Sequence, residues 1–217
     1  MLPGNCARIA ISRALSPVVR ALEGKLLQYA NQTVIEGLPV FVQTDLVDGP
    51  TLTTKMASAF HLLAVFDAGR WARVRHDLSK IFVNQAVGPV FWRGTRACVL
   101  PARLVRISPP EWIAAMVVHE ATNARLGWRR GRRSDPILAV QTCCVRAQMA
   151  FLRKLPLAEF PRRDEFLDYL SQATSKPWWT KSARMLRHRR VLAESGAPEW
   201  FQYLLTGGVG VKEPPKN

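Results

Sequence analysis

Residues 112–126 read W-I-A-A-M-V-V-H-E-A-T-N-A-R-L. Their apolar side chains recur at three- and four-residue steps, which predicts a helix that buries one face. The preceding S-P-P-E is a typical helix start, in which Ser108 is the predicted N-cap and Glu111 the third helical residue. Gly127 marks the expected end of the helix. Because strand-like segments come before this start, the sequence predicts a long helix that follows a strand.

Three polar residues lie on this predicted helix, at His119, Glu120 and Asn123. In the motif H-E-x-x-H, two imidazoles one turn apart hold a zinc ion, and the glutamate beside the first polarises a metal-bound water. Here the first half of that motif is present, and an amide stands at the second imidazole position. The pattern alone leaves open a metal site, the remains of one, or a coincidence.

The segments around this helix predict its surroundings. Strand-like or extended segments are expected at residues 34–46, 80–85, 90–92 and 97–107, and Pro101 predicts that the last of these is an edge or bulged strand. Further helices are expected within residues 5–31 and at 51–77, 136–154, 164–172, 180–194 and 198–205. Thr53 or Thr54 is the expected cap of the helix at 51–77.

Together these segments predict an α+β fold: a helix-rich single domain with a small, mostly antiparallel sheet and a zincin-like active helix after a strand. Residues 1–50 are predicted to form an N-terminal helical and extended segment, and residues 51–205 the main domain. Residues 206–217 are rich in Gly, Pro and Lys and predict a disordered tail.

The charge balance is the outlying feature of the composition. The chain has 31 Lys and Arg against 16 Asp and Glu, a formal net charge of +15. Such a surface attracts polyanions such as nucleic acid, although a general bias toward arginine gives the same count. Arg129, Arg130, Arg132 and Arg133 form the candidate anion-binding cluster, with a second basic run at residues 184–190. The alternative is that these guanidinium groups line solvated helix faces.

The cysteines and the apolar runs bear on the cellular setting. Cys6, Cys98, Cys143 and Cys144 form no C-x-x-C pair, which is typical of a reducing compartment. The N-terminus does not match a secretory signal, and the apolar runs are too short to cross a bilayer. We therefore expect a cytoplasmic protein without a transmembrane segment.

V-V-H-E-A-T-N-A-R-L, residues 117–126, resembles the V-H-E-A-T-H-A-R-L signature of small bacterial proteins related to H-E-x-x-H zinc metallopeptidases. Weaker similarity in the flanks extends over about residues 55–205. The resemblance implies zinc as cofactor, with His119 as a ligand and Glu120 as the catalytic base. It places the second and third ligands at the positions of Asn123 and Gln141.

Two departures from the signature change what the resemblance implies. Asn123 replaces the second histidine, and Gln141 stands where an acidic third ligand is expected; zinc prefers imidazole, thiolate or carboxylate to such neutral amides. The sequence therefore predicts a metallopeptidase-like protein with a degenerate site, inactive or non-proteolytic. Cys143, Cys144 or Asp135 could supply a replacement ligand. Any surviving activity would be attack of water on an amide, with His119 as ligand and Glu120 as base. The alternative function is binding of nucleic acid or another polyanion.

Overall fold

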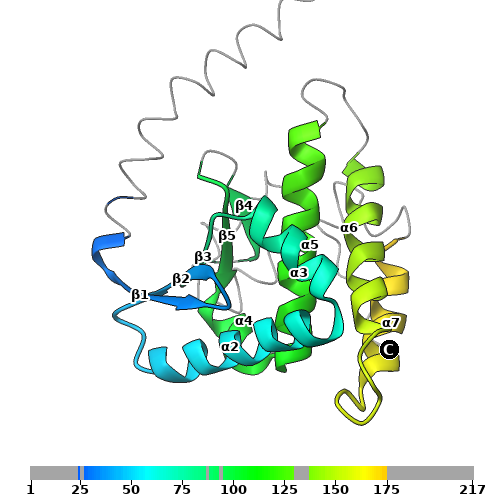
Figure 1. Cartoon of the computed structure of the whole chain (residues 1–217), viewed down its shortest axis with the longest axis horizontal. Coiled ribbons are helices and arrows are strands. Elements are labelled where there is room, and N and C mark those ends of the chain that lie inside the picture. The colour runs from blue at the N-terminus through cyan, green and yellow to red at the C-terminus, as the bar shows by residue number, and fades with distance from the viewer. Residues whose placement is uncertain (1–23, 25–26, 87, 93–94, 130–136, 175–217) are drawn as a thin grey trace, which may run out of the picture. The chain divides into compact units, whose positions relative to one another are not determined.

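A computed structural model of the protein describes residues 24, 27–86, 88–92, 95–129 and 137–174 (Figure 1). These residues form six helices and one five-stranded sheet, which confirms the α+β prediction. The chain divides into two compact units, residues 1–131 and 132–217. The domain limits predicted at residues 50 and 205 stay predictions.

The sheet is mixed, and its strand order is β1-β2-β3-β5-β4. Its strands are β1 (Ala30–Ile35), β2 (Leu38–Gln43), β3 (Lys80–Asn84), β4 (Val90–Trp92) and β5 (Ala97–Pro101). β1/β2 and β4/β5 pair antiparallel, whereas β2/β3 and β3/β5 pair parallel. The prediction of a mostly antiparallel sheet was wrong on this point. The helices between β2 and β3 carry the chain back to the starting end of the sheet, and such a crossover makes the next strand parallel.

β1 and β2 form a tight hairpin where the sequence predicted a single extended segment at 34–46. Glu36 and Gly37 make its two-residue turn with φ values of 48° and 79°, the signs that a type I′ turn requires. Pro39 pairs with Val34 in the antiparallel register. The two short strands could not be separated by pattern alone because the non-glycine residue Glu36 takes one of the left-handed positions.

The helix predicted at 51–77 is two helices, α2 (Gly49–Phe66) and α3 (Ala68–Asp77). Asp67 separates them with φ −149° and ψ 61°, and its side chain accepts a hydrogen bond from the backbone N–H of Arg70 at 3.2 Å. It is therefore the N-cap of α3, a role that its spacing in the apolar pattern did not reveal.

The start of α2 also differs from the prediction. The N-cap is Asp48, and the hydroxyls of Thr53 and Thr54 instead donate back to the carbonyls of Gly49 and Pro50, both at 3.0 Å. Threonines inside a first helical turn commonly bond to the preceding turn in this way.

The strand predicted at 97–107 ends at Pro101, and residues Ala102–Ile107 form the short helix α4. β5 lies between β3 and β4, so the expectation of an edge strand was also wrong. Pro101 is tolerated because it is the last residue of the strand and the N-cap of α4, where a backbone N–H is not needed by the helix. Lys55 of α2 donates to carbonyls at the end of α4, including that of Ser108 at 3.0 Å.

The helix predicted from the opening stretch is confirmed as α5 (Pro110–Arg129). The carbonyl of Pro109 accepts from the backbone N–H of Trp112 at 3.1 Å, so Pro109 takes the capping position and Ser108 is the C-cap of α4. α5 runs through Gly127, which was wrongly expected to end it. A cap assigned from sequence is uncertain by a residue or two, because adjacent cap-forming residues compete.

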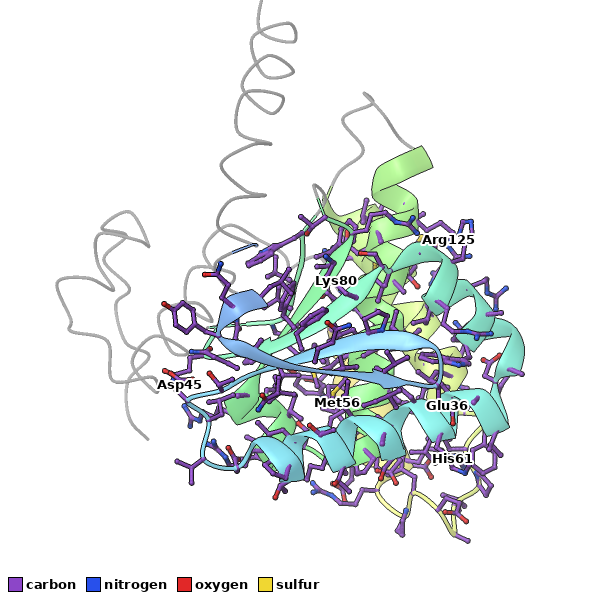
Figure 2. All side chains as sticks on the ribbon, turned by 60° about the vertical axis from the view of Figure 1, so that its left-hand side comes forward. Glu36, Asp45, Met56, His61, Lys80 and Arg125 are labelled. Carbon is purple, nitrogen blue, oxygen red and sulfur yellow. The ribbon has the colours of Figure 1, made fainter. Side chains whose placement is uncertain are left out.

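The core of the first unit lies between one face of the sheet and helices α2, α3 and α5, which contact one another. Met56 of α2 is fully buried and lies between its helix and the sheet (Figure 2). α5 buries a continuous run at residues 113–118. Burial stabilises the folded state by about 1.5–3 kcal/mol for each large apolar side chain. This run therefore contributes much of the free energy that packs α5 against the rest of the unit.

The second unit contains α6 (Ile137–Leu152) and α7 (Arg163–Gln172), as the sequence predicted. The helices predicted at 180–194 and 198–205 and the tail at 206–217 lie outside the described residues. Of the helices predicted within residues 5–31, only residues 24 and 27–31 are described: residues 24, 27 and 28 are helical, and β1 begins at Ala30. Among the described helices, none has the length and apolar character that crossing a bilayer requires.

Candidate functional site

α5 presents His119, Glu120 and Asn123 just after its most deeply buried run. Val117 and Val118 fix the rotation of the helix because both are buried, at 0% and 1% exposure. Glu120 follows them into the interior with 6% exposure, whereas His119 and Asn123 are half-buried. The structure therefore brings the three motif residues together on one helix, with the carboxylate as the innermost group.

Glu120 has a polar partner from its own helix. The amide Nδ2 of Asn123 donates to Oε2 of Glu120 at 3.5 Å, one turn along α5. Burial raises the pKa of the Glu120 carboxyl above its ordinary value, and His119 and the Asn123 hydrogen bond act in the opposite direction. Loss of water around a carboxylate disfavours its charged form, and a neutral amide compensates for only part of that loss.

Cys98 of β5 is a neighbour of Glu120 that the sequence did not indicate. Its side chain is fully buried, and burial together with the negative charge of Glu120 raises the pKa of the thiol well above its ordinary value. A thiol in this setting stays protonated and unreactive. No sequence signal links the two residues, because they meet only where α5 packs against β5.

The predicted metal ligands divide between the two units. His119 and Asn123 lie on α5, whereas Gln141 lies on α6 and is half-buried. Of the proposed replacement ligands, Cys143 is exposed and Cys144 is buried on α6, and Asp135 lies outside the described residues.

The chemistry of the predicted donor set does not fit zinc. It offers one imidazole and two amides, whereas zinc sites are built from imidazole, thiolate and carboxylate. The amide nitrogen of Asn123 is a donor to Glu120, so this side chain already serves the carboxylate beside it. In the part of the chain that the structure describes, no three His, Cys, Asp or Glu side chains are grouped so that they could hold a metal ion.

A second group of charged residues lies where α3 ends beside α5. Asp77 is 9% exposed, and its Oδ2 lies 3.3 Å from Nε of Arg125 on α5. Nδ1 of His76 lies 3.1 Å from the other oxygen of the same carboxylate. Arg96 donates to the backbone carbonyls of His76 and Asp77. These contacts complete the C-terminal turn of α3, where cations are favourable.

Most of the predicted anion-binding cluster lies outside the described residues. Arg130, Arg132 and Arg133 are outside the described residues, and Arg129 is the last residue of α5. Arg125, one turn earlier, pairs with Asp77 and thus serves the fold. The cluster stays a prediction from the sequence.

Comparisons with protein-family models, with characterised proteins and with solved structures find no match for this chain.

Proposed function

We propose that this chain is a metallopeptidase-like protein in which the H-E-x-x-N helix is a non-catalytic element, and that the protein acts by binding. One observation carries the proposal. Asn123 stands at the second imidazole position, and its amide donates to the buried carboxylate of Glu120 at 3.5 Å. A carboxylate that activates water needs access to that water, and Glu120 is directed into the interior instead.

The donor chemistry supports the same proposal. His119 is the only imidazole among the predicted ligands, and Asn123 and Gln141 are neutral amides that bind zinc weakly. Loss of a partner outside the coordination shell already lowers metal affinity or activity about 10–100-fold in zinc enzymes. Replacement of two direct ligands is expected to cost considerably more.

The test is the zinc content of protein purified without a histidine tag, measured for the wild type and for Asn123→His. We expect the wild type to contain far less than one zinc per chain, and Asn123→His to take up more because it restores a second imidazole on the same helix. Peptidase activity is measured on both with an unfolded protein substrate. The matched control is Asn123→Gln, which changes the side chain without adding an imidazole.

Near-stoichiometric zinc in the wild type, with cleavage that is lost in Glu120→Gln, would overturn the proposal. Zinc uptake by Asn123→His, but not by the wild type or by Asn123→Gln, would support the proposal. The wild-type site would then differ from a functional zinc site only in its ligands. An equal zinc content in Asn123→His and Asn123→Gln would contradict the interpretation of α5 as a peptidase-like helix.

A second candidate function is the binding of nucleic acid or another polyanion, favoured by the formal net charge of +15. Affinity for a DNA or RNA duplex is then expected to fall steeply with salt. It should also fall when four basic residues are replaced together: Arg129, Arg130, Arg132 and Arg133. A charge-matched control replaces four exposed basic residues elsewhere: Arg73, Arg103, Arg153 and Lys154. Equal losses in both variants, or no binding at low salt, would rule out a specific site at the first cluster.

A further inference from the structure

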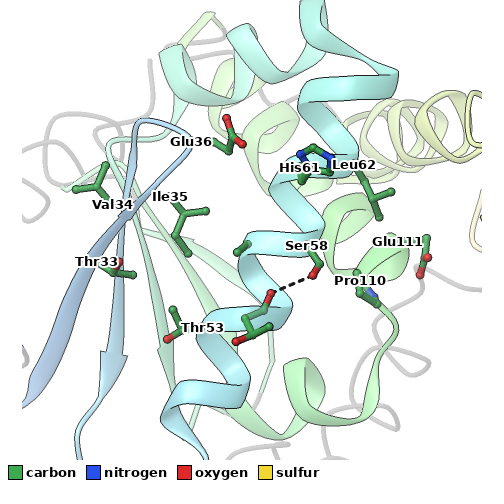
Figure 3. Close-up of a pocket in the computed structure, with 12 residues that line it drawn as sticks. Thr33, Val34, Ile35, Glu36, Thr53, Ser58, His61, Leu62, Pro110 and Glu111 are labelled. Atoms are coloured by element: carbon green, nitrogen blue, oxygen red, sulfur yellow. Dashed lines mark hydrogen bonds between the residues drawn. The ribbon is translucent and has the colours of Figure 1, made fainter.

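An open groove of about 780 Å³ lies over helix α2, with the end of strand β1 on one side and the first residues of α5 on the other (Figure 3). α2 forms its floor, and the hairpin turn after β1 closes one end. Its lining consists of Thr33, Val34, Ile35, Glu36, Thr53, Thr54, Ala57, Ser58, His61, Leu62, Pro110 and Glu111. This groove lies within the first unit and is separate from the His119–Glu120–Asn123 group.

β1 is an edge strand, and the register of the hairpin shows which of its backbone groups face outward. The N–H of Thr44 donates to the carbonyl of Tyr29 at 2.8 Å, and Ile35 pairs with Leu38 across the two-residue turn. Hydrogen-bonded pairs alternate along an antiparallel ladder, so odd-numbered residues of β1 bond to β2. The N–H and C=O groups of Gln32 and Val34 therefore point away from β2. Among the described residues, no strand pairs with them.

The edge of β1, which no strand among the described residues covers, lacks the features that usually protect an edge strand. Ala30–Ile35 contains no charged residue and no proline, and the strand is six residues long. Two large apolar side chains stand exposed beside it, Tyr29 at 65% and Val34 at 61%. Natural edges of this length are normally blocked by Lys, Pro or a bulge because they invite another strand. The other edge, β4, has only three residues.

The charge of the groove differs from that of the chain as a whole. Glu36 and Glu111 belong to the lining, and no Lys or Arg does. Arg75 approaches the hairpin turn from α3, with Nη1 3.2 Å from where a Cβ on Gly37 would lie, but it is not part of the lining. On a chain with a formal net charge of +15, an acidic groove selects for a partner that carries positive charge.

We propose that an extended segment of a partner protein, carrying Lys or Arg, pairs with β1 as an added strand and lies in this groove. Backbone hydrogen bonds to Gln32 and Val34 would supply affinity, and alternate side chains of the segment would enter the space between β1 and α2. Glu36 and Glu111 would contact its basic side chains. The proposal does not depend on whether the α5 helix binds metal.

The test uses a displayed library of random ten-residue peptides, selected on the full chain. We expect enrichment of peptides that alternate apolar residues with Lys or Arg and that lack a central proline. The discriminating variant is Val34→Pro, which removes an outward N–H and none of the bonds between β1 and β2, and is therefore expected to fold. Synthetic copies of the enriched peptides should bind it at least about tenfold more weakly, the effect of roughly one to two backbone hydrogen bonds.

Two controls make the result specific. Glu111→Gln should weaken binding of the basic peptides while the strand pairing persists, and amide hydrogen exchange should slow at Gln32 and Val34 when a peptide binds. The proposal is overturned if the enriched peptides are acidic or bind Val34→Pro equally well. It is also overturned if exchange slows elsewhere only, or if sedimentation shows that a second copy of the chain already occupies β1.

Discussion

In two places in the first unit a histidine is followed directly in sequence by an acidic residue. One pair, His119–Glu120, lies on α5, and the other, His76–Asp77, lies at the end of the neighbouring helix α3. Both acids are buried, at 6% and 9% exposure. Asp77 has a cation, Arg125, with Nε 3.3 Å from its Oδ2. Glu120 has the neutral amide of Asn123, and burial raises the pKa of its carboxyl.

The difference shows that a motif does not by itself identify the acid that forms an ion pair with another helix. The sequence singled out Glu120, because it resembles part of a zinc motif, and gave no reason to notice Asp77. In the structure, Asp77 is the acid with an ion pair across two helices, whereas Glu120 relies on its own helix. A buried carboxylate with an ion pair to another helix and one whose hydrogen bond comes from its own helix should respond differently to substitution.

The largest effect is expected from removing the cation of the α3–α5 pair. Arg125→Met keeps most of the apolar stem but leaves the Asp77 carboxylate buried without its ion pair. We expect a loss of about 2 kcal/mol in the free energy of unfolding, less than for a fully buried pair because Arg125 is partly exposed. Urea unfolding measures it. The double variant Arg125→Met/Asp77→Asn should recover part of the loss, and no recovery would contradict the role given to Asp77.

The next effect concerns the pH dependence that the Glu120 carboxyl contributes to stability. The folded-state pKa of Glu120 is raised, so its contribution to stability is complete below its ordinary value of 4.5 and is lost as pH rises through the raised value. Glu120→Gln should therefore stabilise the protein by about 1 kcal/mol at pH 8 and have little effect at pH 4, the size expected for a buried polar group. Urea unfolding at both pH values tests this. Glu36→Gln, at an exposed position, is the control and should show no such difference.

A smaller effect is expected from Asn123→Ala. This change removes the amide that donates to Oε2 of Glu120 and so disfavours the charged carboxyl. The free energy of unfolding should fall by about 0.5–1 kcal/mol at pH 8 and by less at pH 4, where the carboxyl is protonated. Thermal unfolding at the two pH values gives the comparison. An equal loss at both would mean that Asn123 acts through packing and not through Glu120.

The smallest effect is expected at His76. Its side chain is 86% exposed, although Nδ1 lies 3.1 Å from Asp77. His76→Ala should change the free energy of unfolding by less than about 0.5 kcal/mol at pH 8, as exposed pairs usually do. Urea unfolding of His76→Ala and of Arg125→Met under the same conditions compares how much each partner of Asp77 contributes to the free energy of unfolding. A loss as large as that of Arg125→Met would make His76 the main partner.

The sequence predicted those elements whose signal is local. The long helix at residues 110–129, the strands at 80–84 and 90–92, and the helix at 163–172 all follow from apolar periodicity and turn residues. The errors occurred where two local signals compete. Asp67 caps α3 within a stretch whose apolar pattern predicts one long helix. Pro101 ends a strand that the apolar pattern would continue. For the candidate site, the composition of the H-E-x-x-N segment could be predicted, but not which side chain would point inward.

What the sequence determined by itself is therefore the α+β class, the helix that carries His119, Glu120 and Asn123, and the basic charge of the chain. Only the tertiary structure decided that Glu120 lies near Cys98, that Asp77 pairs with Arg125, and that β1 is an edge strand of the described sheet along an acidic groove. The physical reason is the range of the interactions. Periodicity and capping act within a few residues, whereas burial, ion pairs between helices and the order of strands depend on segments that meet only after folding.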